Sequence, residues 1–191
     1  MIEVDHCFES LVVRFMKTYT LAKSVCLGES FSIIMATARP ATLQYKRSHF
    51  VTHLPVDYLY SPSHSWMARQ EEGLWRVGIT KFAVRMLGEM VDHGFELEAE
   101  VAVEPGQIIG WIEGFKAISD LFCIGKGHFA SGNPALKDKI TLVNKDCYGA
   151  GWLYMLKGIP DTRCMDVHGY RQVLDKTIDK ILEKQKSEEI Q

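Results

Sequence analysis

A lysine flanked by acidic residues stands where two apolar, strand-like runs meet. The segment that contains this lysine and parts of both runs reads Glu113-Gly114-Phe115-Lys116-Ala117-Ile118-Ser119-Asp120-Leu121. If the two runs pair as a tight hairpin, Lys116 lies at its tip, exposed and held in a fixed place. An attachment enzyme needs such an amine if it is to acylate one lysine and ignore the others. Taken alone the pattern is weak, because most exposed turn lysines serve only solvation.

The elements that must position this lysine belong to a β-rich region, residues 56–158. Short apolar runs alternate there with turn signals, which is typical of a small sandwich or barrel. Thr80 is the expected N-cap of a short helix that ends at Gly88, and Asn133 followed by Pro134 predicts a second helix start. The expected strands cover residues 65–70, 74–79, 101–103, 108–115, 117–124 and 152–156, with a turn at Gly125–Gly127.

Two flanking regions complete the chain. Residues 1–55 have weak periodicity, and we expect a leader of uncertain structure. Three alternatives stay open: a short helix over Phe8–Lys23, a disordered or targeting leader, and a true start at Met35. Residues 1–45 are expected to be dispensable for the folded core. Residues 159–191 are expected to be a C-terminal helical extension that packs one face on the β-rich domain, with docking of a partner as the alternative. The apolar residues of that face recur at helical spacing and are Tyr170, Leu174, Ile178, Ile181 and Leu182.

Composition argues against several classes of function. Hydrophobic residues make up 47% and charged residues 24%, and the net charge of -2 gives no basic surface for nucleic acid. The five cysteines are widely spaced and form no C-x-x-C pair, so we expect reduced thiols, no zinc site and no disulfide framework. No apolar run approaches the ~20 residues that a membrane helix needs. The histidines and acids lack the spacing of metal ligands, so no metal is expected.

Four longer motifs occur in order between residues 60 and 156. Together they favour a functional role for Lys116 over simple solvation. They are Tyr60–Trp66 (Y-x-x-x-H-x-W), Val77–Gly88 (V-G-I-T…A…L-G), Glu113–Leu121 (E-x-x-K-A-x-S-D-L) and Leu142–Leu153 (L-V-N-x-D-x-Y-G-x-G-W-L). In these residues the chain resembles the H protein family of the glycine cleavage system. The last motif is long and specific, so chance is not a reasonable explanation.

The resemblance implies a mainly β fold, a flattened lipoyl/biotinyl-type barrel-sandwich with short helices and a C-terminal helix. It implies lipoate in amide linkage on Lys116, with Glu113, Ala117 and Asp120 in the attachment hairpin and His64 at a cleft. It also implies a carrier and not an enzyme, which shuttles an aminomethyl group in glycine catabolism and one-carbon metabolism. The cofactor supplies the reactive chemistry, and the protein supplies position and partner recognition.

The resemblance further implies the partners. They are glycine decarboxylase (P protein), aminomethyltransferase (T protein), dihydrolipoyl dehydrogenase (L protein) and the enzymes that attach the lipoyl group. The L protein reoxidises the dithiol to the disulfide by thiol exchange chemistry. We expect a monomer in the cytoplasm, or in the mitochondrial matrix of a eukaryote, with no nucleic acid or membrane partner.

The chain departs from the family pattern at several positions. Ser65 stands where the family has Glu, and an acid there would help to hold the ammonium of a loaded arm. Cys147 replaces the closing proline, and Ile124–Gly127 replaces a P-x-S-G turn. Two alternatives therefore stay open. One is a diverged H-like lipoyl carrier for another pathway, such as sulfur-compound oxidation or lipoyl relay, and the other is a non-lipoylated binding module with the same fold.

Overall fold

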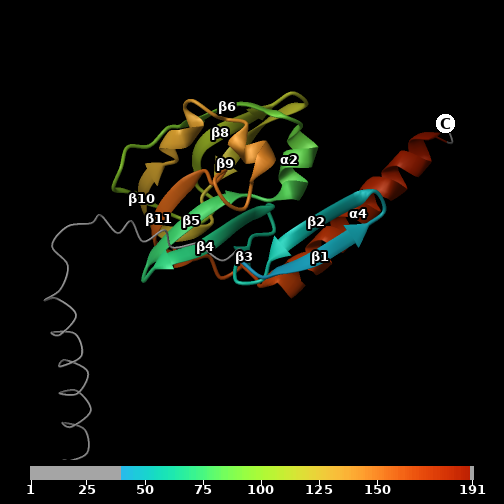
Figure 1. Ribbon diagram of the computed structural model, residues 1–191, viewed down its shortest axis with the longest axis horizontal. Coiled ribbons are helices and arrows are strands. Elements are labelled where there is room, and N and C mark those ends of the chain that lie inside the picture. The colour runs from blue at the N-terminus through green and yellow to red at the C-terminus, as the bar shows by residue number, and fades with distance from the viewer. Residues whose placement is uncertain (1–39, 190–191) are drawn as a thin grey trace, which may run out of the picture. The chain divides into compact units, whose positions relative to one another are not determined.

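The computed structural model describes residues 40–189, whose elements are arranged as in Figure 1. The helix expected over Phe8–Lys23 and the start expected at Met35 lie outside these residues. Within the described range, no helix is long and apolar enough to cross a membrane. The elements are β1 (Thr42–Arg47), β2 (Phe50–Pro55), β3 (Leu59–Tyr60), β4 (Ser65–Glu71), β5 (Leu74–Ile79), α2 (Lys81–Leu87), β6 (Met90–Phe95), β7 (Val101–Val103), β8 (Ile108–Gly114), β9 (Ala117–Phe122), β10 (Gly125–Gly132), η1 (Pro134–Leu136), α3 (Leu142–Lys145), β11 (Tyr154–Pro160) and α4 (Val167–Glu189).

The strands pair into antiparallel sheets. A six-stranded sheet has the order β3-β4-β5-β11-β10-β7, a three-stranded sheet has the order β6-β8-β9, and β1 pairs with β2 in a separate hairpin. The hairpins predicted from the sequence at residues 65–79 and 108–124 are confirmed as β4–β5 and β8–β9. The hairpin that carries Lys116 therefore belongs to the three-stranded sheet.

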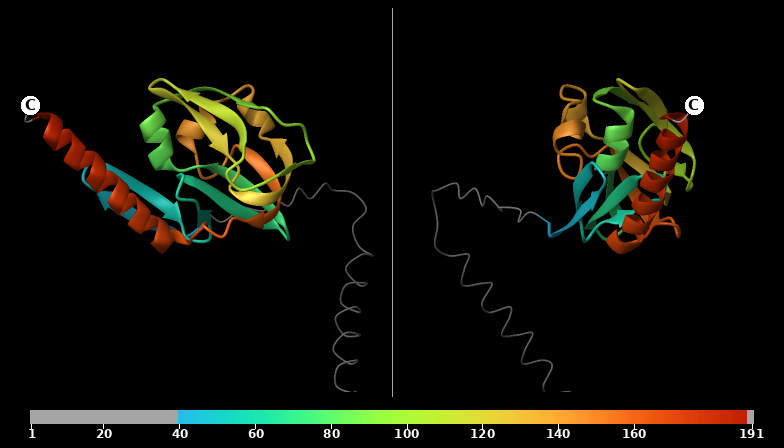
Figure 2. Two further views of the ribbon diagram at one scale, coloured as in Figure 1. Left: turned by 180° about the vertical axis from the view of Figure 1, so that it is seen from behind. Right: turned by 90° about the vertical axis from the view of Figure 1, so that its right-hand side faces the viewer.

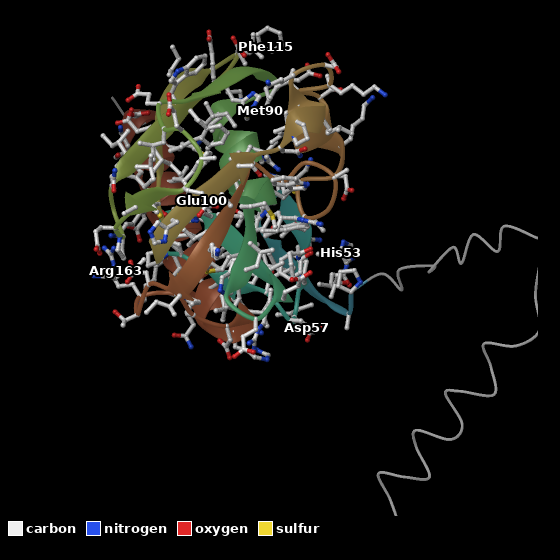
Figure 3. The ribbon with its side chains drawn as sticks, turned by 90° about the vertical axis from the view of Figure 1, so that its left-hand side faces the viewer. His53, Asp57, Met90, Glu100, Phe115 and Arg163 are labelled. Carbon is white, nitrogen blue, oxygen red and sulfur yellow. The ribbon has the colours of Figure 1, made fainter. Side chains whose placement is uncertain are left out.

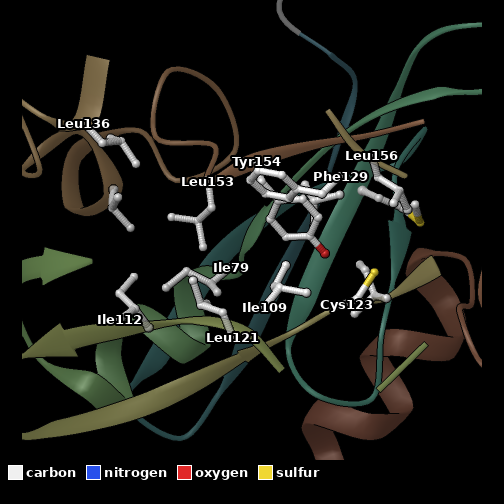
Figure 4. Packing of buried hydrophobic residues seen from close by; sticks show 14 of the residues in the cluster. Ile79, Ile109, Ile112, Leu121, Cys123, Phe129, Leu136, Leu153, Tyr154 and Leu156 are labelled. Carbon is white, nitrogen blue, oxygen red and sulfur yellow. The ribbon is translucent and has the colours of Figure 1, made fainter. Parts of the chain in front are cut away.

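The main core lies between the two larger sheets, and Figure 4 shows part of it. Ile112 and Leu121 reach it from β8 and β9, while Val77 and Leu156 reach it from β5 and β11. All four side chains are at most 5% exposed. Burial of apolar side chains is the main stabilising contribution in such a core. The sheet with Lys116 is therefore held firmly against the larger sheet.

A second core lies between the larger sheet and α4, on the opposite face of β4. Successive strand residues point to opposite faces, so Met67 joins the main core whereas Trp66 and Ala68 join the second one. Leu174 and Ile178 of α4 are 0% and 6% exposed in this second core. The prediction that this helix face packs on the β domain is confirmed for both residues.

The N-terminal hairpin is part of the second core, although the sequence placed it in the leader. Tyr45, Phe50 and Leu54 are all buried there, and Figure 2 shows the hairpin running beside α4. The expectation that residues 1–45 are dispensable is wrong for residues 42–45, because β1 begins at Thr42 and buries Tyr45. The fold thus includes β1, which contains residue 45, and β2, both of which lie within the expected leader.

Polar contacts also join the hairpin to α4 through four residues, called the clasp below. Tyr45 Oη donates to Asp175 Oδ1 at 2.8 Å. The Arg47 guanidinium donates Nε–H to Asp179 Oδ1 at 2.8 Å and Nη1–H to Asp175 Oδ1 at 3.1 Å. The charged side chains are 32% to 44% exposed, and exposed ion pairs contribute only about 0–1 kcal/mol. The apolar cluster therefore supplies most of the stability, and the clasp fixes the position of the hairpin.

Two strand predictions require correction. The turn predicted at Gly125–Gly127 is the beginning of β10, and the last strand begins at Tyr154, not at Trp152. Gly127 lies opposite Gly158 in the β10–β11 pair, where a Cβ on Gly127 would come 2.1 Å from the Lys157 carbonyl oxygen. Glycine within a strand often marks such a close backbone approach. The same residues look like a turn in the sequence because glycine serves both purposes.

Candidate functional site

The tip of the β8–β9 hairpin consists of Phe115 and Lys116, between the paired residues Gly114 and Ala117. The backbone of the tip is anchored to the chain around the end of α2. Phe115 N–H donates to the Glu89 carbonyl oxygen at 3.0 Å, and Lys116 N–H donates to the Leu87 carbonyl oxygen at 2.9 Å. The backbone of Lys116 is therefore fixed in place, as the hairpin predicted from the sequence requires.

The local sequence explains why α2 ends beside this tip. Thr80 caps the helix by accepting a hydrogen bond from Ala83 N–H at 3.4 Å, and Gly88 ends it with φ +88°. A Cβ on Gly88 would lie 3.0 Å from Lys116 Cγ, and one on Gly114 would lie 2.3 Å from the Leu87 carbonyl oxygen. Both glycines allow the helix end and the hairpin to touch. The predicted caps at Thr80 and Gly88 are confirmed.

The side chains of the tip point away from the core. Phe115 is 75% exposed and lies at the edge of the molecule in Figure 3. Lys116 and Asp120 are exposed, and Glu113 is half-buried. In residues 40–189 no carboxylate lies within ion-pair distance of Lys116. The structure thus brings Glu113, Lys116, Ala117 and Asp120 onto one hairpin. The Lys116 amine has no ion-pair partner within residues 40–189.

A groove of about 390 Å³ lies beside Lys116, and that residue is part of its wall. Phe82 and Met86 of α2, together with Phe50 of β2, form an apolar wall, and the last turns of α4 form the opposite one. The aromatic rings of Phe50 and Phe82 meet edge to face at 5.5 Å. The groove is within the size range of small-ligand sites, about 300–1,000 Å³.

His64 is not among the residues that line this groove. It lies against the ring of Phe82, with 4.5 Å between ring centroids, and its Nδ1 is 2.9 Å from the Tyr170 hydroxyl of α4. Tyr170 Oη is also 2.9 Å from Thr80 Oγ1. His64 therefore links the Y-x-x-x-H-x-W segment to the C-terminal helix and to the cap of α2.

Acid is expected to destabilise the fold through His64. Burial lowers the pKa of His64 from 6.5 to about 4, so the unfolded chain binds more protons between these pH values. The stability that neutral His64 contributes is complete above pH 6.5 and is lost as the pH falls towards 4. We expect the midpoint of urea unfolding to depend less on pH between 4 and 6.5 in His64→Asn than in the wild type, because the variant lacks this titrating group. Asn is chosen because it tolerates the left-handed backbone (φ 63°) at this position.

The control for this experiment is His53→Asn, because the His53 side chain is exposed. It removes a histidine without disturbing the contact with Tyr170. Equal slopes of the urea midpoint in His64→Asn and in the wild type would contradict the prediction.

The cysteines of the described region are poor nucleophiles. Burial raises the pKa of Cys147 to about 12 and that of Cys164 to about 11, and it raises the pKa of Cys123 as well. A thiolate is the reactive form, so these values disfavour thiol catalysis. Residues 40–189 also contain no group of three or more His, Cys, Asp or Glu residues placed to hold a metal ion.

Comparison with known proteins decides the family. The model of the glycine cleavage H-protein family matches residues 58–177, which is more than half of the chain. The chain belongs to this family. An H protein of the glycine cleavage system from Corynebacterium jeikeium is 38% identical over 124 residues, which are 63% of this chain and 97% of that protein. One from Bacteroides fragilis is 37% identical over 126 residues, 64% of this chain and 98% of that protein.

A solved H protein confirms the predicted fold class, a mainly β barrel-sandwich of the lipoyl type. The crystal structure of a glycine cleavage system H protein from Mycobacterium marinum matches with a TM-score of 0.56 and 32% identity, covering 61% of this chain and 95% of that chain. The family match spans residues 58–177. The β1–β2 hairpin and the part of α4 after residue 177 therefore lie outside it.

The groove residues that come from outside the family match were not predicted from the sequence. Arg47, His49 and Phe50 lie in or beside the hairpin, and Ile181 and Leu182 lie on α4. They are more than 120 positions apart along the chain. A local signal existed for the hairpin, because Phe50, Thr52 and Leu54 alternate with exposed residues in β2.

Proposed function

We propose that this chain is a lipoyl carrier of the glycine cleavage system, with lipoate in amide linkage to Lys116. The observation that carries the proposal is the tip of the β8–β9 hairpin. There the side chain of Lys116 is exposed, while its backbone N–H is hydrogen-bonded to the Leu87 carbonyl oxygen. When bound, lipoate supplies a dithiol/disulfide pair that takes up and releases a group on sulfur. The chain itself holds the attachment point in position and presents it to partners.

Other lysines of the described region are less suited to attachment. Lys81 Nζ donates to the Asn144 carbonyl oxygen at 2.8 Å, and Lys126 Nζ pairs with Glu104 at 2.9 Å. Lys116 combines exposure with an amine that has no partner among the described residues. An attaching enzyme could therefore select it by position and access. This fit supports lipoate as the cofactor, with Glu113, Ala117 and Asp120 as the strand residues that present the lysine.

In this role the chain is a carrier component and not an enzyme. It would receive an aminomethyl group at the P protein, deliver it to the T protein and be reoxidised by the L protein, in the cytoplasm or in a mitochondrial matrix. The exposed apolar side chains beside Lys116, Phe115 at 75% and Ile118 at 67%, give such partners a surface to contact. His64 supports the fold behind this surface through Tyr170.

The test is glycine decarboxylation by a P protein with the lipoylated chain as acceptor. We expect exchange between bicarbonate and the glycine carboxyl group to depend on the lipoylated chain and to be absent with the unlipoylated chain. Lipoylation is verified beforehand by intact mass. A lipoylated chain that gives no exchange would favour a lipoyl carrier of another pathway, and a chain that takes up no lipoyl group would favour a binding module.

A further inference from the structure

We propose that a second cavity, between β6 and β10, is a binding site for a small aromatic acid that carries a ring hydroxyl. This cavity, called the β6–β10 pocket below, has a volume of about 390 Å³ and is lined by residues of the segments 93–97 and 129–137. Among the described residues, no member of the β8–β9 hairpin lines it. The inference therefore does not depend on the attachment of lipoate to Lys116.

The apolar wall of the pocket is aromatic. The rings of Phe95 and Phe129 lie 5.1 Å apart between centroids and are tilted by 46°. Gly132 lets the Phe95 ring lie against the backbone of β10, because a Cβ there would come 2.8 Å from Phe95 Cε2. Phe129 is 4% exposed and stacks in turn on Tyr154 of β11 (Figure 4). Rings held in this way suit an aromatic ligand, since aromatic pairs prefer offset or edge-to-face contacts.

His93 brings an unpaired polar atom to the pocket. Its Nδ1 is buried and has no hydrogen-bond partner within residues 40–189. Burial lowers the pKa of His93, although Asp92 acts in the opposite direction, so the imidazole is neutral at pH 7. In a neutral imidazole one nitrogen donates and the other accepts, according to the tautomer. A hydroxyl group on the ligand pairs with Nδ1 in either tautomer, because a hydroxyl both donates and accepts.

Lys137 brings a positive charge to the pocket. Its side chain is exposed and forms no ion pair with a described residue. Neither Asp nor Glu occurs among the lining residues that the structure describes. A carboxylate on the ligand therefore meets a cation without a competing anion, and hydrogen bonds to a charged donor are the stronger ones. The aromatic wall, the buried nitrogen and the cation together define the class of ligand.

Titration of the full unlipoylated chain with 4-hydroxybenzoate tests the site, followed by calorimetry and by the backbone amide resonances of ¹⁵N-labelled protein. We expect saturable binding at millimolar concentrations, with shifts at Gly94 and Gly132, which line the pocket. Met86 is the reference, because it lines the groove beside Lys116 and not this pocket. An absence of saturable binding, or saturation that shifts Met86 and leaves Gly94 and Gly132 in place, would overturn the site.

Two analogues test the ligand class on the wild-type chain. Benzoate lacks the hydroxyl that pairs with His93, and methyl 4-hydroxybenzoate lacks the negative charge that pairs with Lys137. We expect both to bind more weakly than 4-hydroxybenzoate. Equal affinity for all three compounds would show that only the aromatic wall contributes, and would overturn the assigned ligand class.

The Lys137→Gln variant tests the charge. We expect it to weaken binding of 4-hydroxybenzoate by up to about fivefold, as an exposed ion pair allows, and to leave the affinity for the methyl ester unchanged. Lys139→Gln is the matched control, since Lys139 is also exposed and does not line the pocket. Equal losses of affinity in the two variants would overturn the role of Lys137.

The His93→Phe variant tests the buried nitrogen. Phenylalanine keeps a ring and removes a polar atom that has no partner, so we expect urea unfolding at the wild-type midpoint or above it. Binding of 4-hydroxybenzoate should weaken by up to about tenfold, towards the affinity of the wild type for benzoate. A folded variant that binds 4-hydroxybenzoate as tightly as the wild type would overturn the hydrogen bond. Should the variant fail to fold, the benzoate comparison still decides the same point on the wild-type chain.

Discussion

The Lys116→Arg variant is expected to fold like the wild type and to gain no lipoyl mass when it is expressed with lipoate and the attaching enzymes. Arginine keeps the positive charge and the long stem, but its guanidinium stays protonated and offers no primary amine for an amide bond. The side chain is exposed and has no ion-pair partner in the described region. Intact mass and thermal unfolding measure both parts of the result.

The matched control is Lys126→Arg. Lys126 lies between Gly125 and Gly127 in β10 and pairs with Glu104 across 2.9 Å. This lysine is also 63% exposed in its side chain, but it belongs to a strand and not to an anchored tip. We expect the control to gain one lipoyl group, as the wild type does. Lipoyl mass on Lys116→Arg would reject the attachment site.

Local signals in the sequence are enough to predict the β8–β9 hairpin and the helix beside it. Thr80 and Gly88 fix the two ends of α2 through their own hydrogen bonding and backbone conformation, which depend little on distant residues. The apolar runs around Lys116 pair with their nearest neighbours along the chain. Such short-range features are what residue patterns describe well.

Long-range contacts explain what the sequence did not predict. The hairpin β1–β2 is stabilised by α4, and the Arg47–Asp179 contact spans 132 positions of the chain. Nothing in residues 42–55 alone says which element will cover Tyr45 and Phe50. The groove has the same origin, because its two walls come from segments that meet only in the folded state. His64 was expected at a cleft, and its contacts with Phe82 and Tyr170 depend on α4 in the same way.

The Leu174→Ala variant is expected to lose about 2–5 kcal/mol of unfolding free energy, the usual cost of truncating a buried leucine in a core. Leu174 is 0% exposed and lies in the second core between α4, the N-terminal hairpin and β4. Urea unfolding of the wild type and the variant measures the difference. Leu182→Ala makes the same truncation on the same helix at a half-buried position, so we expect a smaller loss there.

Both variants should still gain lipoyl mass on Lys116, because the β8–β9 hairpin is anchored by Leu87 and Glu89 and not by α4. A Leu174→Ala midpoint equal to that of the wild type would mean that α4 does not pack on the domain in solution. The hairpin β1–β2 would then lose the surface that covers Tyr45 and Phe50, and the groove beside Lys116 would lose one of its walls. The stability of α4 therefore decides whether the groove beside Lys116 keeps both of its walls.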